Sequence, residues 1–282
     1  MARFTLSAFA DEIDPNFEKQ ISGVKECGIN FIEIRGVNGK NISQHSLDEV
    51  KEIKKILDKE NVKISSIGSP IGKIKITDPI DEHIVVFKNI LEMTKILETK
   101  YIRLFSFFMP ANSCEKNRDE VLKRMDMLVK CAKDYDVILL HENEKDIYGD
   151  TPLRCKDIIE SISSPKLKAV FDPANFVQCD CNVFPDAYNI MAPYIEYMHI
   201  KDALSSDKTV VPAGCGDGKI KEVLSHLKEK NYEGFLSLEP HLASFVGLSQ
   251  LEGGHKSENE TSNNLDKFHI AHDALNKILE EI

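Results

Sequence analysis

Short apolar runs alternate with amphipathic stretches along the whole chain, and this alternation is the feature that most limits the fold. Several runs are apolar without a break, as in Val137-Ile138-Leu139-Leu140, which is typical of parallel strands covered on both faces. Strands that alternate with helices predict a parallel sheet. The eight predicted strands are residues 4–9, 31–35, 62–67, 101–105, 137–141, 168–171, 195–200 and 235–239.

Helix starts recur between these strands. Apolar residues follow each start at helical spacing, up to a last predicted helix over residues 265–279. At three starts, an N-capping residue stands directly before a proline that suits the first helical position. These pairs are Asp14-Pro15, Asp78-Pro79 and Thr151-Pro152.

Eight strand–helix units in 282 residues fit a closed barrel, which typically takes about 250 residues. An open doubly wound sheet is the alternative, but its usual G-x-G-x-x-G turn after the first strand is missing here. No linker rich in proline, glycine or serine divides the chain, so we expect one α/β domain over residues 1–282, a single (β/α)₈ TIM barrel. The polar stretch 247–264 is expected to be a long loop at the catalytic end or a solvated insertion.

Charge and cysteine content argue against several classes of protein. The net charge is −10 without a basic stripe, so we expect no nucleic-acid partner. No apolar run reaches the roughly 18 residues of a membrane span, and the N-terminus lacks the apolar stretch of a signal peptide. Seven irregularly spaced cysteines, with Cys179 and Cys181 as a single C-x-C pair, favour reduced thiols in the cytoplasm over disulfides or a zinc finger. We also expect a homodimer or homotetramer.

Four successive predicted strands end in side chains that can bind a metal ion. They are Glu142, Asp172, His199 and Glu239, each directly after an apolar run. One charged residue at a strand end is ordinary at the water boundary, but the reactive groups of a barrel also gather there. Three converging carboxylates repel one another unless a cation lies between them. The set therefore predicts one divalent ion, and its ligand types suit Mn²⁺, Mg²⁺, Co²⁺ or Zn²⁺.

The strand-end segments HENEKDIYGDTP, FDPANF, MHIKDAL and LSLEPHL resemble, in order, the motifs of the xylose-isomerase-like barrel superfamily. The resemblance spans the chain. It implies that Glu142, Asp172, His199 and Glu239 are the metal ligands and that Glu142 and Glu239 double as the acid/base pair. Three positions depart from the family pattern, because Asn175 and Glu144 stand where histidine is usual and Cys215 where glutamate is frequent.

The resemblance implies an isomerase or epimerase of a sugar, a sugar phosphate or a polyol-derived keto compound. A metal on the carbonyl and the adjacent hydroxyl oxygen would acidify the neighbouring C–H group. One carboxylate would remove that proton to leave a metal-bound enediolate. The proton would then return to the next carbon, an isomerisation, or to the opposite face, an epimerisation.

Three other functions remain open on the sequence. A lyase or dehydratase would apply the same metal chemistry to a cyclitol or a keto acid. An abasic-site endonuclease of the same superfamily would need more histidine ligands than the strand ends supply, and the negative net charge opposes approach to DNA. A metal-free binding barrel is the last alternative.

Three residues are predicted to bind the carbohydrate substrate: Lys201, Asn175 and Arg103. Lys201 shares the strand face of His199, where it can stabilise an enediolate or bind a phosphate. Because no basic residues cluster around it in the sequence, we expect the first role. Arg103 lies inside an apolar run and needs a partner, either Glu142 or the substrate.

Four further residues have ambiguous roles in the sequence. Glu33 lies in an apolar run and needs a partner, as Arg103 does. His141 precedes a predicted ligand but faces the opposite side of its strand, which favours a structural role. His241 and His255 follow the last strand and are more typical of surface histidines than of metal ligands.

Overall fold

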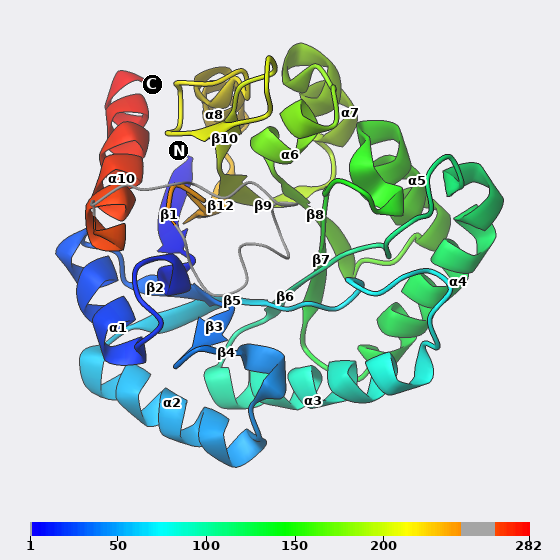
Figure 1. Ribbon diagram of the computed structural model, residues 1–282, viewed down its shortest axis with the longest axis horizontal. Coiled ribbons are helices and arrows are strands. Elements are labelled where there is room, and N and C mark those ends of the chain that lie inside the picture. The colour runs from blue at the N-terminus through cyan, green and yellow to red at the C-terminus, as the bar shows by residue number, and fades with distance from the viewer. Residues whose placement is uncertain (1, 244–262) are drawn as a thin grey trace.

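The computed structural model describes residues 2–243 and 263–282 (Figure 1). Eight parallel strands form a closed barrel in the order β1-β12-β9-β8-β7-β6-β5-β2, and β1 pairs with both β12 and β2. The predicted (β/α)₈ barrel is therefore confirmed, and the open-sheet alternative is wrong. The strands are β1 (Arg3–Ala8), β2 (Phe31–Ile34), β5 (Lys63–Gly68), β6 (Tyr101–Leu104), β7 (Ile138–Glu142), β8 (Leu167–Phe171), β9 (Ile195–Ile200) and β12 (Glu233–Leu238).

Helices surround the barrel between successive strands, as Figure 1 shows. They are α1 (Phe17–Glu26), α2 (Leu47–Glu60), α3 (Asp81–Leu97), α4 (Cys114–Cys131), α5 (Pro152–Ile162), α6 (Pro173–Gln178), α7 (Tyr188–Met191), α8 (Ile220–Glu229) and α10 (Asn264–Glu281). Two small hairpins lie among the connections: β3 (Gly36–Val37) with β4 (Lys40–Asn41), and β10 (Asp202–Ala203) with β11 (Val210–Val211). No helix in the described ranges combines the length and apolarity that crossing a membrane requires. Most of the stretch 247–264, predicted to be a loop, lies outside the described residues.

One of the three predicted helix starts is confirmed. Thr151 caps α5, where its side chain accepts a hydrogen bond from the Arg154 backbone N–H, and Pro152 is the first helical residue. The predictions at Asp14-Pro15 and Asp78-Pro79 are wrong, because α1 is capped by Asn16 and α3 begins at Asp81. Both aspartates instead serve turns before the helices: Asp14 accepts from the Asn16 N–H and Asp78 from the Lys75 N–H.

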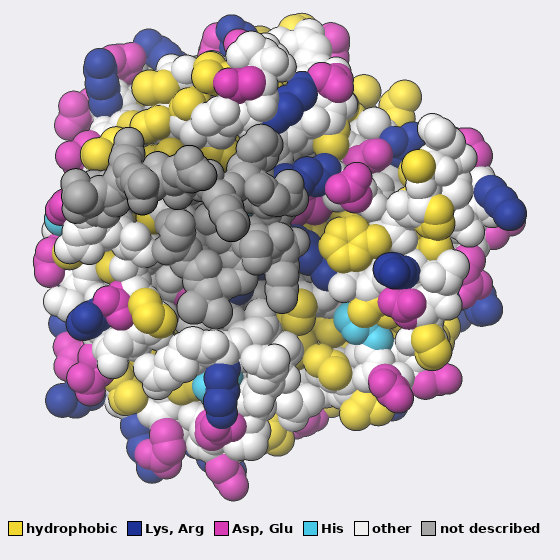
Figure 2. All heavy atoms as spheres, viewed as in Figure 1, with side chains coloured by type: hydrophobic (Ala, Val, Ile, Leu, Met, Phe, Trp, Pro, Cys, Tyr) yellow, Lys and Arg dark blue, Asp and Glu magenta, His cyan; other side chains and the backbone are white. Residues whose placement is uncertain are grey.

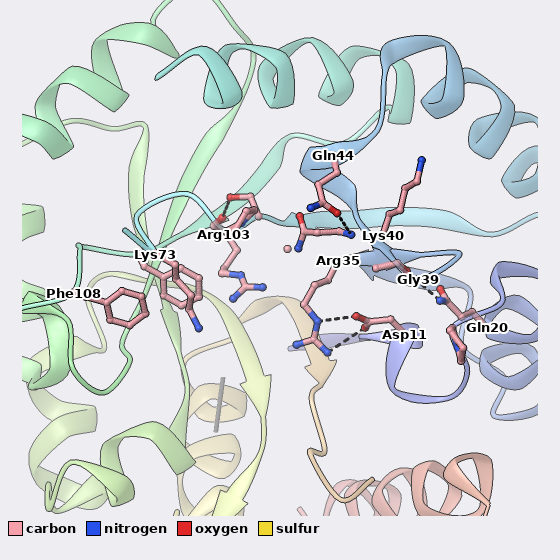
Figure 3. Close-up of a pocket in the computed structure, with 16 residues that line it drawn as sticks. Asp11, Gln20, Arg35, Gly39, Lys40, Gln44, Lys73, Arg103 and Phe108 are labelled. Atoms are coloured by element: carbon pink, nitrogen blue, oxygen red, sulfur yellow. Dashed lines mark hydrogen bonds and ion pairs between the residues drawn. The ribbon is translucent and has the colours of Figure 1, made fainter. Parts of the chain in front are cut away.

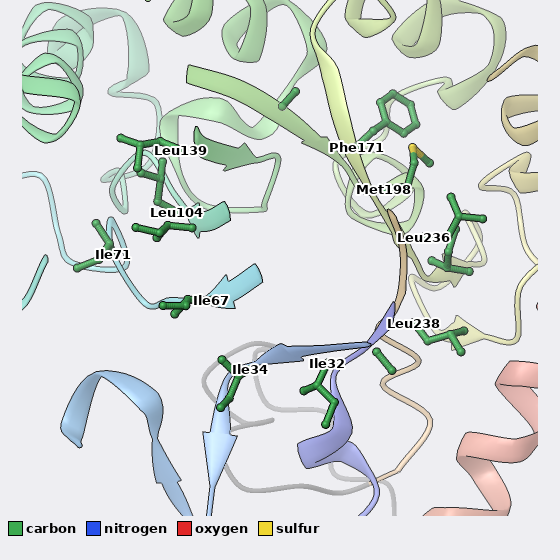
Figure 4. Close-up of a cluster of buried hydrophobic side chains, with 14 of the residues drawn as sticks. Ile32, Ile34, Ile67, Ile71, Leu104, Leu139, Phe171, Met198, Leu236 and Leu238 are labelled. Carbon is green, nitrogen blue, oxygen red and sulfur yellow. The ribbon is translucent and has the colours of Figure 1, made fainter. Parts of the chain in front are cut away.

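Alternation along the strands separates two apolar layers. Residues such as Leu139, Phe171 and Met198 face outward and pack under the helices (Figure 4). A smaller cluster of Tyr101, Leu140, Val170 and Tyr197 packs separately from that outer layer. Because side chains on a strand alternate, Tyr197, His199 and Lys201 share one face of β9 and its extension. This parity directs polar strand-end residues into the barrel mouth.

Candidate active site

The structure brings the four predicted metal ligands together. One potential ligand atom each from Glu142, Asp172, His199 and Glu239 lies within 4.8 Å of all the others, and all four residues are buried. They come from the ends of β7, β8, β9 and β12 or from the residue directly after. We call these four residues the ligand group.

The imidazole of His199 is fixed by contacts at both nitrogens. Its Nδ1 lies 3.0 Å from Glu142 Oε1 and 3.2 Å from Glu239 Oε2, so this nitrogen faces the ligand group. Its Nε2 lies 3.1 Å from Glu33 Oε2, and Phe9 packs edge-on against the ring. A carboxylate behind a histidine orients the ring and fixes its tautomer in many metal sites. Glu33 therefore fits a supporting role behind His199.

Two oxygens of the ligand group are suited to a cation. Asp172 Oδ2 and Glu239 Oε2 are buried, and both face cationic side chains rather than backbone N–H groups. Lys201 Nζ lies 3.0 Å and 3.6 Å from these atoms. A cluster of three buried carboxylates is costly unless cations compensate it. The donor set of three carboxylates and one imidazole fits a divalent ion.

The other glutamate oxygens are held from outside the group. Arg103 donates to Glu142 Oε2 at 3.0 Å, and Arg35 donates to Glu239 Oε1 at 2.9 Å. Burial alone would raise the pKa of Glu142, but His199 and Arg103 hold it at about 2. Burial is likewise opposed at Glu239, chiefly by Lys201 and His199, and its pKa lies well below the ordinary value. Both glutamates are therefore ionised at neutral pH.

The three predicted substrate-binding residues lie in different surroundings. Lys201 is buried between the carboxylates of the ligand group. The amide of Asn175 donates to Glu142 Oε1 at 3.3 Å and to the Asn143 carbonyl at 2.9 Å. Arg103 makes the ion pair with Glu142 that the sequence offered as one alternative.

Arg35 is a site residue that the sequence reasoning missed. Its guanidinium contacts both carboxylate oxygens of Asp11 at 2.9 and 3.1 Å, Glu12 at 3.2 Å and Glu239 at 2.9 Å. The available signal was alternation, because Arg35 follows Glu33 by two residues and therefore shares its strand face. Of the acids that it joins, Asp11 and Glu12 are adjacent in the sequence, but Glu239 lies more than 200 residues away.

The interpretation of His241 as a surface residue is wrong. Its side chain is 2% exposed, and its Nε2 lies 3.4 Å from Glu239 Oε1 and 3.7 Å from Glu12 Oε1. Burial and Lys201 lower the pKa of His241, but Glu12 and Glu239 raise it by more, so that the pKa is about 9. Glu12, Glu239 and His241 thus form a second group of potential ligands that shares Glu239 with the first. His255 lies outside the described residues.

The remaining ambiguous histidine, His141, is buried on the opposite side of β7 from Glu142. Burial lowers its pKa to about 4, and neither of its ring nitrogens has a hydrogen-bond partner in the described part of the chain. These surroundings fit the structural role expected from strand alternation.

One buried carboxylate organises the glycine-rich loop after β9. Asp202 Oδ1 accepts from the N–H groups of Gly218 and Ala203 at 2.8 and 2.9 Å. Its Oδ2 accepts from Gly214 and Gly216 at 2.8 and 3.0 Å. A Cβ at Gly216 would lie 2.4 Å from Asp202 Oδ1, so the close approach requires glycine there.

A cavity of about 510 Å³ is lined by residues that contact the ligand group (Figure 3). Its wall includes Arg35 and Arg103, the two arginines that hold the outer oxygens of Glu239 and Glu142. The wall comes from the ends of β5 and β6 and from the segments that follow β1, β2, β5 and β6, whereas the ligand group comes from β7 to β12. Figure 2 shows cationic and anionic side chains interspersed around the face seen in Figure 1.

Solved structures resemble the fold closely despite low sequence identity. The IolI protein, solved with a zinc atom, is 17% identical with a TM-score of 0.76, covering 99% of each chain. A D-allulose 3-epimerase from Methylomonas sp. is 17% identical with a TM-score of 0.75, covering 100% of this chain and 98% of its own. The probable 3-DHS dehydratase AsbF from Bacillus anthracis is 18% identical with a TM-score of 0.73, covering 98% and 99%.

Comparisons of sequence agree on the family. No curated protein matched the sequence. The family model described as xylose isomerase-like TIM barrel matches residues 21–264, a span that contains all four residues of the ligand group. The chain therefore belongs to the xylose isomerase-like TIM barrel family.

Proposed function

We propose that this protein is a divalent-metal-dependent isomerase or epimerase of a sugar, a sugar phosphate or a polyol-derived keto compound. One observation carries the proposal: Glu142, Asp172, His199 and Glu239 converge from four strand ends around His199 Nδ1. Solved structures that share this fold include a D-allulose 3-epimerase and an L-ribulose 3-epimerase, which supports the same reaction class here.

In this proposal, Glu142, Asp172, His199 and Glu239 would hold the divalent ion, which would supply a Lewis acid for the substrate carbonyl and so acidify the neighbouring C–H group. Glu142 and Glu239 are ionised, which is the state that accepts a proton. They approach the site from β7 and from the end of β12, so each can serve one face of a substrate between them. Arg103 and Arg35 hold the outer oxygens of these carboxylates and thereby orient them.

A lyase or dehydratase that uses the same proton abstraction is the second candidate. The wall of the cavity contains more cationic than anionic side chains, which suits a keto acid, and the similar AsbF structure is that of a probable dehydratase. The products separate the two candidates, because a dehydratase releases water whereas an isomerase or epimerase conserves the atoms of its substrate.

Metal content tests the ligand group. Purified protein should hold roughly one divalent ion per chain, and Asp172→Ala combined with Glu239→Ala should lose it because two of the four donors are gone. Asp119→Ala on the surface of α4, where the side chain is 99% exposed, is the matched control. Full occupancy in the double variant, measured by elemental analysis after dialysis, would refute the proposed site.

Turnover in D₂O tests the proton transfer. If the glutamates exchange a carbon-bound proton, NMR of the product should show deuterium at the carbon next to the carbonyl. A product without deuterium would indicate a hydride shift, and the acid/base role of Glu142 and Glu239 would then be wrong. The role of the two glutamates as metal ligands is tested separately by the metal analysis.

A further inference from the structure

Cationic side chains dominate the wall of the cavity beside the ligand group. Among the described residues that line it, Arg35, Lys40, Lys73 and Arg103 are cations and Asp11 is the single acid. Figure 3 shows the head groups of Arg35, Lys73 and Arg103 directed toward a common space. The sequence shows no such cluster, because these residues come from separate strand ends.

The acids that pair with these cations contribute little to the wall itself. Glu142 accepts from Arg103 and Glu144 from Lys73 at 3.1 Å, and neither glutamate is among the residues that line the cavity. Both pairs are largely buried, so solvent screens them little. The cavity is therefore bordered by cations whose counter-charges lie behind them.

One donor in this wall has no partner. Arg103 is 2% exposed, and its buried Nε makes no hydrogen bond within the described residues. A buried guanidinium N–H without an acceptor is costly, since it has lost water and gained nothing in exchange. Because this Nε is out of reach of a ligand in the cavity, a bound anion would compensate the guanidinium through its charge and through the other guanidinium nitrogens.

An aromatic ring brings two of the cations together. Lys73 Nζ lies 4.3 Å from the centroid of the Phe105 ring, and the Arg103 guanidinium carbon lies 4.6 Å from the same centroid. Cation–π contacts of this kind stabilise both charges without consuming their N–H donors. The two side chains are thus held beside one ring with donors available to a ligand.

Two side-chain amides also line the cavity. The side-chain oxygens of Asn41 and Gln44 accept hydrogen bonds within their own turn, which leaves the amide nitrogens outside that capping interaction. Both residues line the cavity. Amide nitrogens are donors that recognise hydroxyl and carbonyl oxygens, the groups of a polyhydroxy compound.

We propose that this cavity binds the anionic end of the substrate, a carboxylate or a phosphate, on Lys73 and Arg103. The inference rests on the proposed function, and it narrows the substrate from sugars in general to a polyhydroxy acid or a sugar phosphate. Bound this way, the anionic group lies beside Phe105, and the other end of the molecule extends toward Glu142 and Glu239.

Three probes of similar length and different charge test this inference: D-sorbitol, D-gluconate and D-sorbitol 6-phosphate. Their dissociation constants are measured by calorimetry on the full-length protein, with and without added Mn²⁺. We expect at least one anionic probe to bind about tenfold or more tightly than D-sorbitol, and the preference to shrink as salt is added. Preference for gluconate assigns a carboxylate, and preference for the phosphate ester assigns a phosphate.

Variants separate recognition of the anion from general stability. Lys73→Met should weaken the preferred anion about tenfold or more while leaving the D-sorbitol constant nearly unchanged, and Lys73→Arg should restore part of the difference. Lys63→Met is the control for net charge, because Lys63 is exposed at the opposite end of β5. An equal loss for all three probes in Lys73→Met would mean that Lys73 is only structural.

The inference is overturned if D-sorbitol binds as tightly as both anions, or if none of the three probes binds. Metal content and deuterium exchange are measured on the same protein, so the two ideas can fail separately. Metal binding and turnover of neutral ketoses without anion preference would refute this inference alone. Anion preference in a protein that neither binds metal nor exchanges protons would refute the proposed function instead.

Discussion

The substitution Asp202→Asn probes how one buried carboxylate orders the glycine-rich loop after β9. The carboxylate accepts four backbone N–H groups, two on each oxygen. Asparagine keeps the shape and one carbonyl oxygen, which can still accept two of these bonds. Its NH₂ group would face the other two N–H donors, so those donors would lose their acceptor.

The expected loss in the free energy of unfolding follows from the number of N–H donors that lose their acceptor. A buried donor left without an acceptor costs about 1–3 kcal/mol, so two such donors cost about 2–6 kcal/mol. This is a large share of the roughly 5–15 kcal/mol by which a folded domain is usually stable. With a urea dependence of about 3 kcal/mol per molar for a chain of this size, the midpoint should fall by about 0.7–2 M.

Urea unfolding followed by far-UV circular dichroism measures this effect. Asp217→Asn is the matched control in the same loop, because within residues 2–243 and 263–282 the Asp217 carboxylate accepts only from Ser205, near the surface. We expect the midpoint of the control to stay close to that of the native protein. If Asp202→Asn unfolds at the same urea concentration as Asp217→Asn, the four hydrogen bonds do not stabilise the fold as argued.

Three further predictions concern the barrel mouth. If Lys201 stabilises an enediolate, Lys201→Met should lower kcat about 10²-fold or more. A rise in KM alone would indicate that Lys201 binds an anionic substrate. Kinetics within about twofold of native would mean that Lys201 has neither role. Burial lowers the pKa of His83, which accepts a hydrogen bond from the Gly72 N–H. The stability that this group contributes is present above the ordinary histidine pKa of about 6.5 and is lost as the pH falls through the lowered value. In a plot of urea midpoint against pH, His83→Gln should therefore flatten the slope in that range. An unchanged slope would contradict this. Gly68→Ala should cost about 1–3 kcal/mol, because the new Cβ would lie 2.7 Å from Phe9 Cε1; an unchanged urea midpoint would refute the tight packing there.

Strand alternation is the reason that much of the architecture could be predicted from the sequence. An uninterrupted apolar run of four to six residues between helical patterns is typical of a strand covered on both faces, and alternation near its end places every second residue at the barrel mouth. His199 and Lys201 follow this parity. The convergence of Glu142, Asp172, His199 and Glu239 follows from closing the barrel.

The features of the site that the sequence did not predict depend on contacts between segments that are distant in the sequence. Arg35 joins Asp11, Glu12 and Glu239, and no local pattern indicates which of the many acids in the sequence a given arginine will meet. The burial of His241 depends on how the segment after β12 lies against Glu12. Two predicted helix starts were wrong for a local reason. Asp14 and Asp78 accept hydrogen bonds from N–H groups of turns, and these bonds compete with capping of a helix.

The division of the barrel mouth has a consequence for how such an enzyme can diversify. The ligand group is encoded after residue 141, whereas the cavity wall is encoded before residue 109. Mutation or recombination in the first half can therefore change which molecule enters while leaving the residues of the ligand group intact. Chimeras that join residues 1–110 of a relative to the second half of this chain are a direct route to new substrate ranges. The contacts of Arg35, Arg103 and Glu33 with the ligand group are among those that such a graft must keep.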